Sequence, residues 1–298
     1  MGGCGGNGPA AHREPAKPAP APALGGVRDT SRLVTIGGRR SLFLDCIGSG
    51  TPTVVLEAGF GGNTHDWEAV QPGLGKTTRV CAYDRAGIGN SVAGEGVRDA
   101  ADEIDDLEHL LAAAHVDPPD VLVGHSYGGL LARLFAQAHA DDTAGIVLVD
   151  SMGRNQTRRT MAIWPKSQFR RLRRVLAQPV REGVDLAAGE ALAARIRTLH
   201  GIPLAVVTAG SETFGGAPPR LARALGGLWA TMQDELAALS SDHVHVVAVR
   251  SDHFVQGPEG QPDVVIRAVQ AVVDAARDHT PLSSCARLFH GGGRRCRD

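Results

Sequence analysis

The segment Asp120–Ala140 constrains the fold of this chain more than any other part of the sequence. It reads DVLVGHSYGGLLARLFAQAHA: an apolar run typical of a buried strand leads into Gly124-His125-Ser126-Tyr127-Gly128 and then into an apolar helical pattern. A strand that turns so sharply into a helix brings the two elements into contact, and side chains at the glycine positions would clash there. The segment therefore predicts a strand, a tight turn that exposes Ser126, and a helix.

Compact apolar runs of the same kind recur along the chain and alternate with helical patterns, as in βαβ units. We expect strands at Arg32–Ile36, Ser41–Ile47, Thr53–Glu57, Arg79–Tyr83, Val121–Gly124, Gly145–Asp150, Pro203–Thr208 and Val244–Val249. Helical patterns lie at Ala101–Ala114, Leu130–Ala138, Leu228–Leu239 and Val264–Ala276. A chain of 298 residues with 43% hydrophobic residues accommodates these elements in one large domain. The expected fold is α/β, with an eight-stranded, mostly parallel sheet flanked by helices.

The N-terminal residues differ in composition from the domain that we expect over residues 27–280. Residues 1–26 are rich in Gly, Ala and Pro and predict a disordered linker. Within them, Gly3-Cys4-Gly5-Gly6 is similar to the start of a mature bacterial lipoprotein. If translation began upstream of Met1, we would expect an extracytoplasmic protein, secreted or held to a membrane by an N-terminal lipid tether; otherwise we expect a cytoplasmic one. No stretch approaches the roughly 20 apolar residues of a spanning helix.

Cysteine placement suggests one disulfide and no metal site. Cys285 and Cys296 bracket a polar, Gly-rich tail within residues 281–298, and a disulfide between them would pin it. Cys46 and Cys81 lie in expected strands and are interpreted as small buried hydrophobic residues. No two cysteines have the spacing of metal ligands, so we expect no metal.

A long insert follows the strand that ends at Asp150. About fifty residues without a strand signal, 151–200, separate it from the next strand, and their helical patterning predicts a helical lid over the active site. The first half of this insert is strongly basic. We interpret the charges as a solvated helix face, or alternatively as an attraction for an anionic substrate or a membrane surface.

The turn at Ser126 indicates a nucleophile, because this strand-turn-helix arrangement exposes the serine hydroxyl above the sheet. The backbone N–H of Tyr127 starts the helix and is one candidate donor to an oxyanion. Phe60, in the Gly-rich loop after the third strand, supplies a second candidate N–H. A serine needs an imidazole to take its proton, and His253 follows the last strand in a short loop.

Five pieces of the sequence resemble the α/β-hydrolase superfamily, in its bacterial esterase/lipase-like group: VVLEAGFGG, VCAYDRAGIGNS, VLVGHSYGGLLARLFA, GIVLVDS and SDHFVQ. The likeness runs from about Arg32 to Ala276. It implies a catalytic order of serine, acid and histidine, with His253 as the base. It also implies that Asp84 and Arg85 belong to a structural loop.

The resemblance leaves the acid of the triad open. Most relatives carry it after the seventh strand, where this chain has Thr208-Ala209-Gly210-Ser211-Glu212-Thr213, and Glu212 is one residue out of register. Some lipases of this fold carry it after the sixth strand, where this chain has Asp150. We prefer Asp150 and keep Glu212 as the alternative.

Together these features predict a serine hydrolase that cleaves carboxylic esters through an acyl-enzyme, without any cofactor. His65 and Trp229 are candidates to line the substrate pocket. The alternatives are an aminopeptidase or a thioesterase with the same triad, or a non-catalytic binding protein of this fold. The expected partner is a small-molecule acyl substrate, and a formal net charge of −1 argues against nucleic acid.

Overall fold

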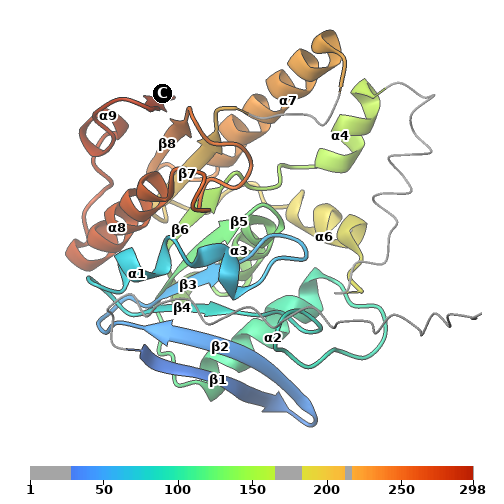
Figure 1. Cartoon of the computed structure of the whole chain (residues 1–298), viewed down its shortest axis with the longest axis vertical. Coiled ribbons are helices and arrows are strands. Elements are labelled where there is room, and N and C mark those ends of the chain that lie inside the picture. Colours follow the sequence, from blue (N-terminus) through green and yellow to red (C-terminus); the bar gives the residue numbers. More distant parts are fainter. Residues whose placement is uncertain (1–27, 165–182, 212–216, 298) are drawn as a thin grey trace, which may run out of the picture.

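The computed structural model describes residues 28–164, 183–211 and 217–297, which build one sheet covered by helices on both faces (Figure 1). The nine strands of the sheet lie in the order β1-β2-β4-β3-β5-β6-β7-β8-β9. Their bounds are β1 Arg28–Gly37, β2 Arg40–Ile47, β3 Val54–Glu57, β4 Val80–Tyr83, β5 Asp120–His125, β6 Thr143–Val149, β7 Leu204–Ala209, β8 His243–Ala248 and β9 Arg294–Cys296. Neighbouring strands from β4 to β8 pair in parallel, whereas β1, β2 and β9 pair antiparallel.

Helices cover both faces of the sheet, which explains why the central strands are apolar at every position rather than at alternate ones. One core cluster lies under α2 (Ala100–Ala113), α3 (Tyr127–Ala138), α6 (Leu186–Ala193) and α7 (Pro219–Ala237). The other lies under α1 (Gln71–Leu74), α8 (Pro262–Asp278) and α9 (Cys285–Leu288). β3, β4, β5 and β7 are buried along their whole length between these two layers.

All eight predicted strands are present, and the α/β prediction with a mostly parallel sheet is confirmed. The ninth strand, β9, comes from the C-terminal tail and pairs with β8 at the edge of the sheet. Its three residues, Arg-Arg-Cys, have no apolar alternation, so their sequence does not indicate a strand. The disulfide Cys285–Cys296 joins this strand to α9.

A second disulfide corrects the sequence-based interpretation of Cys46 and Cys81. These cysteines are bonded to each other, and they face each other in the antiparallel register of β2 and β4. The interpretation as free buried residues was wrong because it placed both in strands without knowing which strands are neighbours. Both side chains are fully buried, as that interpretation expected.

Two helices, α4 (Gln156–Ile163) and α6, lie in the insert between β6 and β7 and stand side by side at the right of Figure 1. Thr157 of α4 donates to the Glu190 carboxylate of α6 from both its backbone N–H and its hydroxyl. Arg159 of the insert pairs with Glu235 of α7, and Arg154 donates to the carbonyl of Ala194 within the insert itself. A lid that covers the active site stays a prediction. Among the described residues, no helix is long and apolar enough to span a membrane.

Candidate active site

Ser126 lies at the turn between β5 and α3 with φ of 51° and ψ of −114°. A positive φ is rare for a residue with a side chain, and such backbone strain occurs mainly at functional sites. Glycines on either side make the turn possible. A Cβ on Gly124 would lie 2.4 Å from the carbonyl oxygen of Gly128, and a Cβ on Gly128 would lie 2.2 Å from the carbonyl oxygen of Glu57.

The Gly-rich loop after β3 packs directly against this turn. A Cβ on Gly59 would lie 3.4 Å from the Cβ of Ser126 and 2.8 Å from Nδ1 of His125. The rings of Phe60 and Tyr127 meet edge to face with centroids 5.7 Å apart. The two residues predicted as oxyanion donors are therefore neighbours in space.

A cavity of about 290 Å³ opens beside Ser126. Its lining residues are Gly59, Phe60, Gly61, Gly62, Asp66, His125, Ser126, His253 and Phe254. The loop after β3, the turn after β5 and the loop after β8 thus meet at the carboxyl ends of parallel strands, where this class of sheet binds ligands.

His253 lies in the loop after β8, and its Nδ1 is 2.7 Å from Oδ2 of Asp150. Asp150 directly follows β6, is fully buried and has a positive φ of 40°. Its other oxygen, Oδ1, accepts hydrogen bonds of 2.9 Å from the backbone N–H of Ala209 and from Nε1–H of Trp229. Two N–H groups thus hold Oδ1 in place, while Oδ2 faces the imidazole of His253. Glu212, the alternative acid, lies outside the described residues.

Trp229 was predicted to line the substrate pocket, but the structure places it against Asp150. Its ring meets His253 edge to face at 6.0 Å, and only 9% of its surface is exposed. It is absent from the residues that line the cavity beside Ser126. The helical pattern does not reveal this, because the contact joins residues 79 positions apart in the chain.

His65 was the other predicted pocket residue. It lies on a short 3-10 helix, Thr64–Trp67, with a mostly exposed side chain beside Glu68, and the described lining residues do not include it. Its neighbour Asp66 lines the cavity instead. Burial raises the pKa of the Asp66 carboxyl above its ordinary value, against the opposing effect of Arg85.

His125, inside the Gly-His-Ser-Tyr-Gly turn, supports the loop that carries His253. Its Nε2 lies 2.9 Å from the carbonyl oxygen of His253, and the two rings are 4.6 Å apart. Burial, with the nearby His253 second, lowers the pKa of His125 to about 3. The neutral ring must therefore carry its proton on Nε2 in order to donate to that carbonyl. Its position inside the Gly-His-Ser-Tyr-Gly turn was the available signal for this role.

Among the described residues, no group of three or more His, Cys, Asp or Glu side chains is arranged to hold a metal ion. The ring of Tyr127 is fully buried, and its hydroxyl donates to Glu103. The side chain of Tyr127 is therefore not exposed to a substrate at Ser126.

Residues 52–201 match the family model described as alpha/beta hydrolase fold. The chain is 28% identical over 243 residues to the protein YqjL of Bacillus subtilis, an alignment covering 77% of this chain and 86% of YqjL. It is 30% identical over 128 residues to a 2-hydroxy-6-oxo-2,4-heptadienoate hydrolase of Pseudomonas putida, covering 42% of this chain and 46% of that enzyme.

Solved structures show the same fold. A thermophilic esterase from Thermogutta terrifontis superposes with a TM-score of 0.56 at 22% identity, covering 83% of this chain and 99% of the esterase. A meta-cleavage product hydrolase from Pseudomonas fluorescens superposes with a TM-score of 0.60 at 18% identity, covering 82% of this chain and 98% of that enzyme. The esterase-like group expected from the sequence is thus represented among its structural relatives. The chain belongs to the α/β-hydrolase fold family and is a hydrolase of that family.

Proposed function

We propose that this protein is a serine hydrolase that cleaves carboxylic esters through an acyl-enzyme intermediate. The observation that carries the proposal is the 2.7 Å contact between Nδ1 of His253 and the buried Asp150 carboxylate, with His253 and Ser126 lining one cavity. A carboxylate that accepts a hydrogen bond from Nδ1–H holds the ring proton on that nitrogen. The other ring nitrogen, Nε2, is then unprotonated and able to accept a proton from a serine.

In the proposed reaction, Ser126 Oγ attacks the ester carbonyl while its proton passes to Nε2 of His253. The negative oxygen of the tetrahedral intermediate accepts hydrogen bonds from the backbone N–H groups of Phe60 and Tyr127. When the intermediate collapses, His253 gives its proton to the leaving alkoxide and an acyl-Ser126 ester remains. Water then attacks this ester with His253 again as base, which releases the acid and restores the serine.

Asp150 would hold the imidazole in the required tautomer and stabilise the imidazolium that forms in each half of the reaction. Its two other donors, from Ala209 and Trp229, keep the carboxylate in place. The hydrogen bond from His125 to the backbone of His253 would hold the loop that carries the base.

The cavity favours a small acyl group. Its volume of about 290 Å³ lies at the lower end of the range for ligand pockets, roughly 300 to 1,000 Å³. Phe60 and Phe254 supply apolar surface, and Phe254 is 54% exposed beside the histidine. Short, apolar acyl chains fit these dimensions best.

One observation favours a second candidate, an aminopeptidase with the same triad. A peptidase that recognises a free amine needs a carboxylate near its pocket, and the cavity beside Ser126 is lined by Asp66. A substrate amine would be attracted to that carboxylate when it is ionised.

A substrate panel separates these functions. Nitrophenyl esters of increasing acyl length would be assayed beside aminoacyl nitroanilides and acyl thioesters, with Ser126→Ala as the control. We expect the short esters to be cleaved fastest and Ser126→Ala to be inactive. Faster cleavage of aminoacyl amides, lost in Asp66→Asn, would favour the aminopeptidase. Equal activity of wild type and Ser126→Ala would overturn the proposed mechanism.

A further inference from the structure

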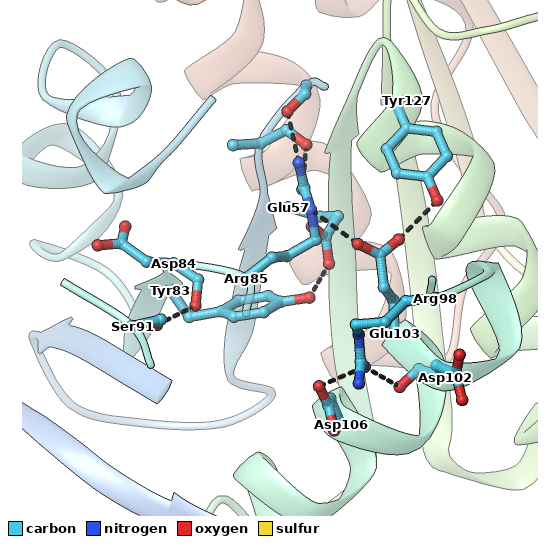
Figure 2. Close-up of polar contacts among 12 residues, drawn as sticks. Glu57, Tyr83, Asp84, Arg85, Ser91, Arg98, Asp102, Glu103, Asp106 and Tyr127 are labelled. Carbon is cyan, nitrogen blue, oxygen red and sulfur yellow. Dashed lines mark hydrogen bonds and ion pairs between the residues drawn. The ribbon is translucent and has the colours of Figure 1, made fainter. Parts of the chain in front are cut away.

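A buried network of charged residues lies next to the Gly-rich loop after β3, which carries the candidate oxyanion donor Phe60 (Figure 2). It consists of Glu57 at the end of β3, Arg85 after β4 and Glu103 in α2, each no more than 4% exposed. Nη1 of Arg85 is 2.6 Å from Oε1 of Glu57, and its Nε is 3.5 Å from Oε1 of Glu103. Burying such groups costs free energy that their mutual attraction does not always offset. Stability alone is therefore a weak reason for the network.

Arg85 also holds the backbone of the loop that lines the cavity. Its Nη1 donates to the carbonyl oxygen of Ala58 and its Nη2 to that of Gly59, each at 2.6 Å. The Gly59 oxygen receives a further hydrogen bond of 3.0 Å from the N–H of Gly62, which closes the turn. The orientation of the peptide group between Gly59 and Phe60 is therefore fixed from two sides.

This orientation matters because a trans peptide group points its C=O and its N–H in opposite directions. The Gly59 carbonyl is turned towards the buried Arg85, so the N–H of Phe60, in the same peptide group, is turned away from it. Phe60 and the glycines on both sides of it line the cavity beside Ser126, so this peptide group lies at the cavity wall. Without Arg85, the loop's glycines would allow this peptide group to rotate.

The same network reaches the second candidate donor. The hydroxyl of Tyr127 donates to Oε2 of Glu103 at 2.5 Å, and the guanidinium carbon of Arg85 lies 5.5 Å from the centre of the Tyr127 ring. Figure 2 shows Tyr127 and Arg85 converging on Glu103 from opposite sides. The side chain of Tyr127 is thus held at its far end while its backbone N–H begins α3.

We propose that Arg85 is a positioning residue that aims the Phe60 N–H at the oxyanion, with Glu57 and Glu103 holding its guanidinium in place. This inference rests on the proposed serine-hydrolase function. It gives Arg85 a role in catalysis beyond the structural one that the sequence suggested. Arg85 does not touch the substrate in this account, and its effect reaches the reaction through the peptide group between Gly59 and Phe60.

Arg85→Lys tests the proposal with little change in charge. A lysine keeps the positive charge between the two carboxylates, but its single ammonium cannot reproduce the planar fork that reaches both carbonyl oxygens. Arg98→Lys is the matched control. Arg98 is also buried, with 7% of its surface exposed. Its side chain donates to the Asp106 carboxylate and to the carbonyl of Asp102, both outside the Gly-rich loop after β3.

The measurement compares an ester with the matching thionoester, in which sulfur replaces the carbonyl oxygen and accepts hydrogen bonds poorly. For Arg85→Lys we expect kcat on the ester to fall about tenfold to a hundredfold, short of the 10²- to 10³-fold cost of deleting an oxyanion donor. KM should change little, and the preference for ester over thionoester should fall with kcat. Arg98→Lys should keep both kcat and the preference.

A second variant covers the case in which Arg85→Lys does not fold. The double substitution Arg85→Gln and Glu103→Gln preserves the net charge of the network and leaves Tyr127 an amide oxygen to donate to. It should show the same loss of kcat and of ester preference.

Two outcomes are distinguishable. If the wild type shows Ser126-dependent turnover but a folded Arg85 variant keeps its kcat and its ester preference, the positioning role is wrong and the serine mechanism stands. If the wild type shows no Ser126-dependent turnover, the proposed function fails and the positioning role fails with it.

Discussion

Replacing Asp150 by asparagine changes the charge and hydrogen bonding of one buried side chain while leaving its size almost unchanged. The two donors on Oδ1, from Ala209 and Trp229, require an acceptor, so the amide oxygen of the asparagine takes that place. The amide NH₂ then faces Nδ1 of His253, where Oδ2 of the aspartate lies 2.7 Å away in the native chain.

The effect of this substitution on catalysis depends on which ring nitrogen of His253 carries the proton. To accept a hydrogen bond from an NH₂ group, Nδ1 of His253 must be unprotonated, so the ring proton moves to Nε2. A protonated Nε2 cannot take the proton of Ser126. In serine hydrolases this change costs about 10⁴-fold in kcat. At 1.36 kcal/mol per factor of ten, the loss is about 5 kcal/mol of transition-state stabilisation.

Steady-state hydrolysis of a short nitrophenyl ester, with circular dichroism melts for folding, measures the effect. Trp229→Phe is the matched control: it removes one donor to Oδ1, leaves the Ala209 N–H, and should lower kcat by less than about tenfold. Glu212→Gln should leave kcat unchanged. A folded Asp150→Asn variant whose kcat is within tenfold of the wild-type value would mean that Asp150 is not the acid of the triad. A large loss of kcat in Glu212→Gln would then identify Glu212 as that acid.

Three further predictions concern the turn, a buried acid and the disulfides. Gly128→Ala places a Cβ 2.2 Å from a backbone oxygen, so we expect both activity and melting temperature to fall. Burial, aided by repulsion from Asp142, raises the pKa of Asp120 to about 7 from 3.8, so native stability falls as pH rises between these values. Relative to wild type, Asp120→Asn should therefore be about 3 kcal/mol more stable at pH 8 than at pH 5, measured by urea unfolding. Mild thiol treatment should open Cys285–Cys296 before the fully buried Cys46–Cys81, because thiol exchange needs access; mass spectrometry after alkylation shows the order.

Local sequence patterns were enough to predict the parallel core and the turn at Ser126. Four to seven consecutive apolar residues predict a buried strand wherever it lies in the sheet. The clash that excludes a side chain at Gly124 is local, with Gly128 four residues later, which is why the sequence around Ser126 is enough to indicate the turn. The clash at Gly128 is with the distant carbonyl of Glu57 and is visible only in the structure. Asp150 and His253 were predictable as residues at the ends of strands. Their catalytic roles stay a proposal.

Features that depend on long-range placement could not be predicted in this way. Cys46 and Cys81 are 35 residues apart in the sequence. To predict their disulfide, one has to know that β2 and β4 are neighbouring strands and that their register places the two cysteines opposite each other. Trp229 and His125 each form a hydrogen bond with a residue more than seventy positions away in the chain. The C-terminal strand β9 has no apolar pattern, and it is held in place by its disulfide to Cys285 and by its pairing with β8 at the edge of the sheet.

Covalent labelling of Ser126 tests the central claim most directly. Wild-type protein would be treated with a fluorophosphonate, and its mass and modified peptide determined. Ser126→Ala and Ser91→Ala are the parallel samples, because Gly89-Asn90-Ser91 is a second Gly-x-Ser sequence in the chain. We expect a single phosphonyl adduct on the peptide that contains Ser126, unchanged in Ser91→Ala and absent in Ser126→Ala. An unlabelled wild type, or an adduct that persists in Ser126→Ala, would contradict the identification of Ser126 as the nucleophile.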